Sequence, residues 1–151
     1  MVDIYFETNY GKLYEKIEKG INTVFDHSNS YGKVRHMFIK RKIDTSLNDE
    51  KWYDLVTPYG YGGPLIMACE QDKEALLVHD FEESFCEYCK ENNIVSEFIR
   101  FHPIIDNAND FKNVYEVFYD RDTVGTNLAD YEKPFEAEFS KSCRKNIRRA
   151  L

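Results

Sequence analysis

The chain has 151 residues, a length typical of one domain, and a formal net charge of −7. Its content of 42% hydrophobic and 15% aromatic residues excludes a disordered chain, and its acidity argues against a general nucleic-acid binder. The first residues hold no signal-peptide core, and no apolar run is long enough to span a membrane. We therefore expect a cytoplasmic protein with no membrane partner, whose four cysteines are free thiols.

The first third of the chain is predicted to form one strand and a short helix, followed by three further strands. Residues 2–7 alternate and carry aromatic side chains, which predicts a strand. The polar segment 9–20 has two apolar residues four apart and ends on glycine, which predicts a short helix. The next strands are expected at 21–28 and 32–43, joined as a hairpin by the turn signal NSYG, and another at 52–57.

The rest of the chain contains the two longest predicted helices. Apolar residues with a period near 3.6 predict the first of them over 74–92. A proline in the first turn and an apolar residue at every fourth position predict the second over 134–150. Three strands are expected between them, at 94–103, 114–120 and 123–128.

This order of elements mixes hairpins with helical crossovers and shows no linker or internal repeat. It predicts one domain over residues 1–151 of the α/β (α+β) class, with a mixed, largely antiparallel sheet flanked by helices. We expect the strands from 32–43 onward to lie in a single sheet.

Cys86 and Cys89 form a C-x-x-C pair. A zinc site would need two further ligands at suitable spacing, and Cys69, Cys143 and the four histidines are scattered. The pair also lies inside the predicted amphipathic helix 74–92. These observations favour buried free thiols, and we predict no metal site.

The segment 57–64, TPYGYGGP, holds three glycines and two prolines. It lacks both the G-K-[ST] of a P-loop and a G-x-G-x-x-G that opens a helix, so a turn with positive φ is the better interpretation. Tyr59 and Tyr61 are candidates to line a ligand cleft there. His102, at a predicted strand end, is a candidate site residue, although a lone histidine in such a place is more often structural.

The end of the chain, FSKSCRKNIRRAL, carries five basic side chains that no acid interrupts. Such a run is either a solvated face or an anion site, and two features favour the anion site. Arginine suits phosphate, and a cationic patch stands out in an acidic chain. We predict that Arg144 and Arg148 bind ligand phosphates with help from Lys40. A line of apolar residues should hold this helix on the sheet: Phe135, Phe139, Cys143 and Ile147.

Several segments, in this order, carry a resemblance to a known family. They are VTPYGYGGPLI, then EYCKENNIVSEFIRFHP, and finally TVGTNL with FSKSCRKNIRRA. The chain resembles the Fem-type acyltransferases, the peptidoglycan-bridge aminoacyltransferases and their relatives in the GNAT-like superfamily. The most specific match is the helix R-x-N-I-R-[KR]-A, formed here by residues 144–150. The resemblance covers essentially the whole chain.

The resemblance implies a GNAT-like fold for this chain, as the first of two such domains. It implies that a second GNAT-like domain, the missing partner here, supplies most of the acyl-donor site. The donor in the full enzyme would be acyl-CoA or an aminoacyl-tRNA, and the acceptor a nucleotide-linked compound or another amine. We therefore expect no cofactor on this domain alone and no catalysis by it alone, and no catalytic residue is assigned.

Two interpretations from different classes stay open. The first is the acceptor-binding domain of a Fem-type acyltransferase. If the acyl donor is an aminoacyl-tRNA, then tRNA is also a partner. The alternative is a stand-alone binding or interaction module that kept the fold without the chemistry. RNA binding through the last helix is weaker, because no base-stacking pattern of aromatic and basic residues accompanies it. An uncovered domain surface also leads us to expect a homodimer.

Overall fold

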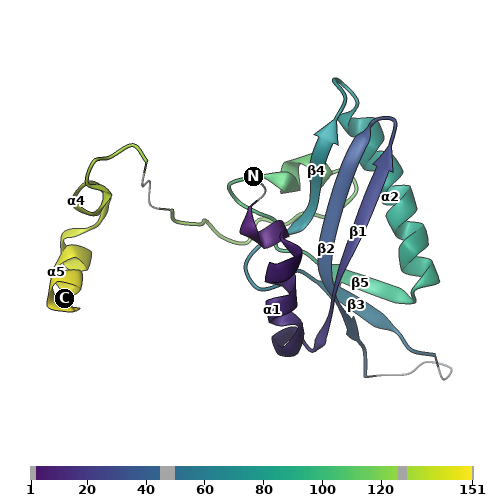
Figure 1. Cartoon of the computed structure of the whole chain (residues 1–151), viewed down its shortest axis with the longest axis horizontal. Helices are drawn as coiled ribbons and strands as arrows, with labels where there is room; N and C mark the ends of the chain where they lie inside the picture. The colour runs from purple at the N-terminus through teal and green to yellow at the C-terminus, as the bar shows by residue number, and fades with distance from the viewer. Residues whose placement is uncertain (1–2, 45–49, 126–128, 151) are drawn as a thin grey trace. The chain divides into compact units, whose positions relative to one another are not determined.

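The computed structural model describes residues 3–44, 50–125 and 129–150. The chain divides into two compact units, residues 1–118 and 119–151. Unit 1 contains the sheet and its helices, and unit 2 contains the last two helices (Figure 1). The prediction of one domain resembling the first half of a Fem-type enzyme stays a prediction.

Unit 1 is built on a sheet of five strands in its described part. They are β1 (Gly20–Asn29), β2 (Gly32–Lys42), β3 (Tyr53–Val56), β4 (Gly63–Cys69) and β5 (Ile94–Phe98). The order is β1-β2-β3-β5, with β4 paired to another part of β2. All pairs are antiparallel except β3 with β5, which is parallel. The predicted class, mixed α/β with a largely antiparallel sheet and flanking helices, is confirmed.

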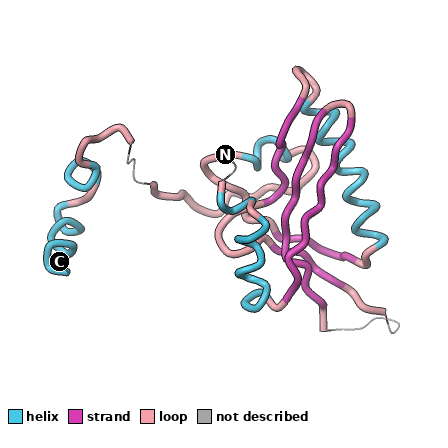
Figure 2. The backbone as a smooth tube through the Cα atoms, viewed as in Figure 1, coloured by secondary structure: helices cyan, strands magenta, loops and turns pink. Residues whose placement is uncertain are grey.

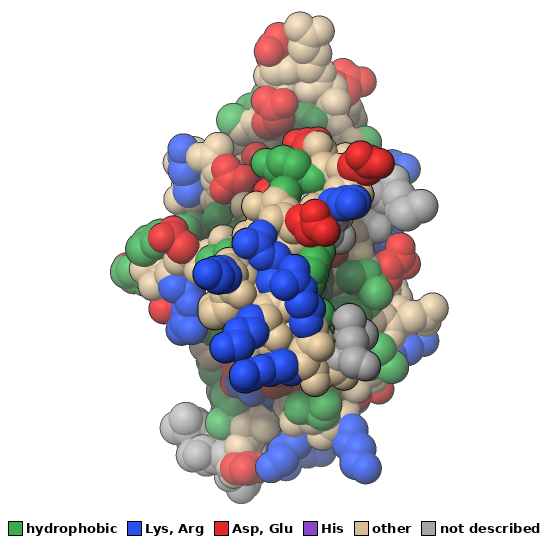
Figure 3. All heavy atoms as spheres, turned by 90° about the vertical axis from the view of Figure 1, so that its left-hand side faces the viewer, with side chains coloured by type: hydrophobic (Ala, Val, Ile, Leu, Met, Phe, Trp, Pro, Cys, Tyr) green, Lys and Arg blue, Asp and Glu red, His purple; other side chains and the backbone are tan. Residues whose placement is uncertain are grey.

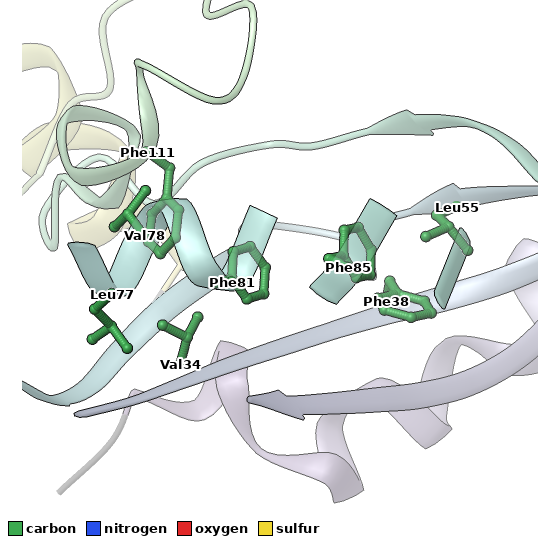
Figure 4. Packing of buried hydrophobic residues seen from close by; sticks show 8 residues of the cluster. All are labelled: Val34, Phe38, Leu55, Leu77, Val78, Phe81, Phe85 and Phe111. Atoms are coloured by element: carbon green, nitrogen blue, oxygen red, sulfur yellow. The ribbon is translucent and has the colours of Figure 1, made fainter. Parts of the chain in front are cut away.

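Helices cover both faces of this sheet (Figures 1 and 2). On one face lies α2 (Glu74–Glu91), whose buried residues pack on alternate residues of β2, such as Val34 and Phe38. On the other lies α1 (Thr8–Glu18), which contacts β1 and β2 and follows the short 3-10 helix η1 (Ile4–Phe6). The main core therefore lies between α2 and the sheet, where one side of it is closed by Phe111 of α3 (Asn107–Phe111), as Figure 4 shows.

Several predicted elements are confirmed with small changes of bounds, among them the first helix, the hairpin β1–β2, β3 and α2. The hairpin turn is closed by the Asn29 side chain, whose Oδ1 accepts from the N–H groups of Tyr31 and Gly32. Such a local side-chain bond is the reason that asparagine signals a turn. The predicted strand 94–103 is shorter in the structure, ending at Phe98, with only Phe101 beyond it in an isolated bridge to Gly62.

Two predicted strands are wrong, and a third lies partly outside the residues that the structure describes. Within 2–7, residues 4–6 form a 3-10 helix, because the Asp3 carboxylate accepts from the Tyr5 N–H and caps that turn. Residues 114–120 form no strand, because none of the strands in the described part of the chain pairs with them, and 116–120 are exposed. Residues 123–125 are irregular, and 126–128 lie outside the described residues. Conversely, β4 was not predicted, since Gly63 and Pro64 at its start are typical of the glycine-rich loop before it.

The predicted helix 134–150 is two helices, α4 (Pro134–Glu138) and α5 (Lys141–Ala150). Phe139 has an extended backbone, and the hydroxyl of Ser140 accepts from the Cys143 N–H, so a serine cap starts α5. The expected single apolar line is therefore wrong, because Phe135 and Phe139 do not share a helix with Cys143 and Ile147. Packing of this segment on the sheet stays a prediction. In the described ranges no helix is both long and apolar enough to cross a membrane.

Candidate functional site

Helix α5 concentrates positive charge in unit 2. Five of its ten residues are basic, and its first turn holds no acid. None of these side chains forms an ion pair with an Asp or Glu of the described residues. Figure 3, which faces unit 2, shows Lys and Arg side chains gathered together. We call these five side chains the cationic row: Lys141, Arg144, Lys145, Arg148 and Arg149.

The two predicted phosphate ligands in the cationic row differ in how they are held. Arg144 Nη1 donates to the backbone carbonyl of Glu136 in α4, which fixes one edge of its guanidinium. Arg148 lies one turn further along the same helix, so the two arginines present donors on the same side of α5. A guanidinium can bind phosphate through two parallel N–H donors, so this pair is suited to an anion.

Lys40, the third predicted ligand, belongs to unit 1. Its Nζ donates to Asn92 Oδ1 at 3.0 Å and lies 4.4 Å from the centre of the Tyr53 ring. These contacts join the end of α2 to the sheet, so Lys40 has a structural role in unit 1. Its help to the arginines stays a prediction.

The glycine-rich loop 57–64 is held by Arg100, which follows β5. The guanidinium of Arg100 donates to the carbonyl oxygens of Thr57, Pro58 and Gly60, at 2.8, 3.2 and 3.1 Å. Gly60 has φ +95°, and a Cβ there would lie 2.3 Å from the Tyr5 ring. The predicted turn with positive φ is confirmed, and three carbonyl oxygens of the loop accept from Arg100.

The structure brings two of the predicted cleft residues together. Tyr61 packs against the rings of His102 and Tyr5, at 5.3 and 5.4 Å between centroids. Tyr59 lies elsewhere on the loop and stacks on Tyr14 of α1 at 5.9 Å. That these tyrosines line a ligand cleft stays a prediction.

His102 has structural contacts on both sides. It is buried, and its Nδ1 accepts from the N–H groups of Ile104 and Ile105, both at 3.2 Å. Its backbone N–H donates to Asn107 Oδ1, and Asn107 Nδ2 in turn donates to the carbonyls of Gly62 and Pro64. Because the accepting Nδ1 is occupied by backbone donors, these contacts favour the structural interpretation of His102.

A cavity of about 650 Å³ lies beside the N-terminal half of α2, and no predicted site residue lines it. Its walls include the carboxylates of Glu74, Glu82 and Asp110 together with Cys69. Burial raises the pKa of Asp110, and the charges of Asp106 and Glu74 raise it further. The charge of this cavity suits an amine and opposes a phosphate. Its residues come from β4, from α2 and from the region around the end of α3, so no single stretch of the sequence could predict it.

A second group that sequence reasoning missed lies in the core under α2. His36 is fully buried, and its Nε2 is 2.6 Å from Glu97 Oε1. The Tyr115 hydroxyl also bonds Glu97, and burial, followed by the Glu97 charge and this bond, raises the pKa of Tyr115. His36 has no exposed surface, so this His36–Glu97–Tyr115 network is closed to a substrate and ties together β2, β5 and the segment after α3.

All four cysteines are free thiols. Cys86 is exposed rather than buried as predicted, because it points away from the sheet on α2, whereas Cys89 is half-buried. Burial, and then the charge of Glu97, raises the pKa of Cys89 to about 12. No cluster of three or more potential metal ligands occurs among the residues described.

We expect Cys89 to react with iodoacetamide at least ~10-fold more slowly than Cys86 at pH 8, because the thiolate is the reacting species and burial suppresses it. Mass spectrometry of the folded chain over time measures the two rates. In denaturant all four cysteines should react alike. Equal rates in the folded chain would show that the Cys89 thiol is not protected.

Comparison of the chain with protein-family models, with curated proteins and with solved structures found no match. The resemblance to Fem-type acyltransferases therefore rests on the motifs in the sequence.

Proposed function

We propose that this chain is the acceptor-binding first domain of a Fem-type, GNAT-like N-acyltransferase of the cytoplasm. In this proposal the cationic row of α5 binds the phosphates of a nucleotide-linked acceptor. The acyl donor, acyl-CoA or an aminoacyl-tRNA, is bound mainly by a second GNAT-like domain. The chain alone is not catalytic.

The observation that carries the proposal is the set of five basic side chains on α5, none of which forms an ion pair with an Asp or Glu that the structure describes. In a chain of net charge −7, a row of five cations without ion pairs to described acids forms a local positive potential that attracts anions. The backbone opposes this attraction, because the C-terminal end of a helix carries partial negative charge. The side chains must therefore supply the whole attraction, and arginine supplies it best for phosphate.

The motif order in the sequence supports the choice of family. Gly63 and Pro64 end the loop and begin β4, and the segment that ends at Pro103 follows α2, in the order that the resemblance implies. The motif R-x-N-I-R-[KR]-A falls within α5. The cationic row thus coincides with the most specific part of the resemblance.

Replacing Arg144 and Arg148 together by alanine should weaken binding of uridine diphosphate by at least ~10-fold. A charge-assisted bond to phosphate contributes about 1.5–3 kcal/mol, and ~1.4 kcal/mol corresponds to tenfold in affinity. Isothermal titration of the full chain at low salt measures the affinity. The melting temperature should hardly change, since no residue of α5 is buried.

A matched control removes two positive charges from the same unit at other positions, Arg121→Ala with Lys133→Ala. It should leave the affinity within about twofold, because screening weakens the effect of distant charges. Equal affinity in wild type and the Arg144/Arg148 variant would mean that the cationic row is only a solvated face. Phosphate binding with no acyl transfer after addition of a second GNAT-like domain would favour the alternative, a stand-alone binding module.

A further inference from the structure

Helix α1 turns its polar side toward the sheet. The inward positions are Thr8, Gly11, Glu15 and Glu18, which recur every three or four residues along one helical face. The Asn22 side chain of β1 donates to the carbonyl of Thr8, and its backbone N–H donates to Glu15 Oε1 at 2.9 Å. Gly11 makes this approach possible, since a Cβ there would lie 2.0 Å from Asn22 Oδ1. An amphipathic helix normally buries the opposite, apolar side.

The apolar side of α1 consequently faces outward. Leu13 and Ile17 lie one turn apart and are 71% and 70% exposed. Tyr10 and Tyr14 lie beside them, and Tyr59, itself 67% exposed, extends the surface from the loop. Figure 2 shows the backbone of α1 lying over one face of the sheet, which it contacts through β1 and β2. Because these exposed side chains are on the side of the helix turned away from that face, we call them a projecting ridge.

The charge of this outward side is positive. Lys12, Lys16 and Lys19 are all exposed along it. The two acids within the helix are turned inward: Glu15 accepts from the Asn22 N–H, and Glu18 lies 3.7 Å from Arg41. A chain with a net charge of −7 thus presents three lysines around two bulky aliphatic side chains.

We propose that α1 is a membrane-surface anchor, which docks on a bilayer that contains anionic lipids. Leu13 and Ile17 enter the boundary between headgroups and acyl chains, as the apolar face of an interfacial helix does. The lysines extend to anionic headgroups, and the tyrosines lie at the level where amphipathic rings are enriched. Such attachment needs no spanning segment, so it is compatible with the absence of a long apolar run.

Two features favour a lipid surface over a protein partner. A convex ridge fits a deformable surface directly, whereas a protein would need a groove of matching shape. The flanking charges are lysines, whose long stems reach from an apolar boundary into water. The inference is independent of the proposed function, because it concerns α1 of unit 1 and not the cationic row.

Cosedimentation of the full chain with vesicles tests the anchor. We expect binding to phosphatidylcholine vesicles with 30% phosphatidylglycerol at low salt, and much weaker binding to pure phosphatidylcholine. The pair Leu13→Asn and Ile17→Asn should weaken binding at least ~30-fold through lost apolar transfer. Lys12, Lys16 and Lys19 replaced by glutamine should weaken it ~100-fold.

Matched controls lie elsewhere on the surface. Ile104→Asn replaces an isoleucine that is 84% exposed, and glutamine at Lys33, Lys51 and Lys90 removes the same charge; both should bind as wild type. Binding of uridine diphosphate should be unchanged in the α1 variants. The anchor is overturned by absent binding to the anionic vesicles, or by binding that depends on the cationic row and not on Leu13 and Ile17. A dimer that the Leu13/Ile17 variant dissociates would also overturn it, because a second copy would then cover α1.

Discussion

Replacing Glu97 by alanine should lower the free energy of unfolding by about 1–3 kcal/mol, the range for leaving a buried polar group without its hydrogen-bond partner. The Glu97 side chain is 12% exposed and His36 is 0% exposed, so the substitution leaves His36 Nε2 without its partner in the core. It also removes the acceptor of the Tyr115 hydroxyl. His36 Nδ1 already has no hydrogen-bond partner among the described residues, so the ring has no second contact to compensate. Urea denaturation measures the change.

Glu83→Ala is the matched control, because Glu83 lies on the surface of α2 with only a 3.8 Å contact to the exposed His79. It should cost less than about 1 kcal/mol, as surface pairs do. Tyr115→Phe should fall between the two, at about 1 kcal/mol, because it removes one hydrogen bond and leaves Glu97 bonded to His36. If Glu97→Ala cost no more than Glu83→Ala, the buried network would contribute nothing to stability.

Phe81→Ala should cost about 3–5 kcal/mol, the range for truncating a buried aromatic residue. Phe81 is fully buried at the centre of the cluster between α2 and the sheet (Figure 4). Its ring stacks on Phe85 at 5.6 Å and meets Phe111 edge-on at 5.6 Å. Thermal and urea denaturation should both show the loss.

Leu76→Ala provides the comparison on the same helix, because Leu76 is 45% exposed. This substitution should lower the free energy of unfolding by less than about 1 kcal/mol, because a half-exposed leucine buries less apolar surface on folding than Phe81 does. The variant Phe81→Leu should recover part of the stability, since it refills part of the cavity. A Phe81→Ala chain as stable as Leu76→Ala would show that α2 does not pack on the sheet in this register.

The elements that could be predicted are those whose pattern is local. Helix α2 follows from apolar residues at a 3.6-residue period, and the hairpin β1–β2 follows from alternation around an asparagine turn. Residues 114–120 alternate equally well but have no strand to pair with, and pairing cannot be read from one segment. The break before α5 depends on a single serine cap, which a regular four-residue spacing concealed.

The candidate site was predictable only as far as it lies on one element. The cationic row is contiguous in sequence, so its charge and its helix were visible there. The role of Arg100 in tying the loop at 57–60, and that of Asn107 in joining two loops, arise from contacts over forty or more residues. The outward apolar side of α1 is the reverse of what its pattern indicates, because Gly11 lets a polar strand residue approach.

An NMR titration of the ¹⁵N-labelled full chain with uridine diphosphate tests the central claim most directly. The account predicts saturable, salt-sensitive shifts in the amide resonances of residues 141–150, since phosphate binds there through charge-assisted bonds that salt screens. Resonances of the tied loop 57–64 should stay in place. Absence of shifts in α5 at low salt, or saturable shifts confined to unit 1, would contradict the assignment of the cationic row as the phosphate site.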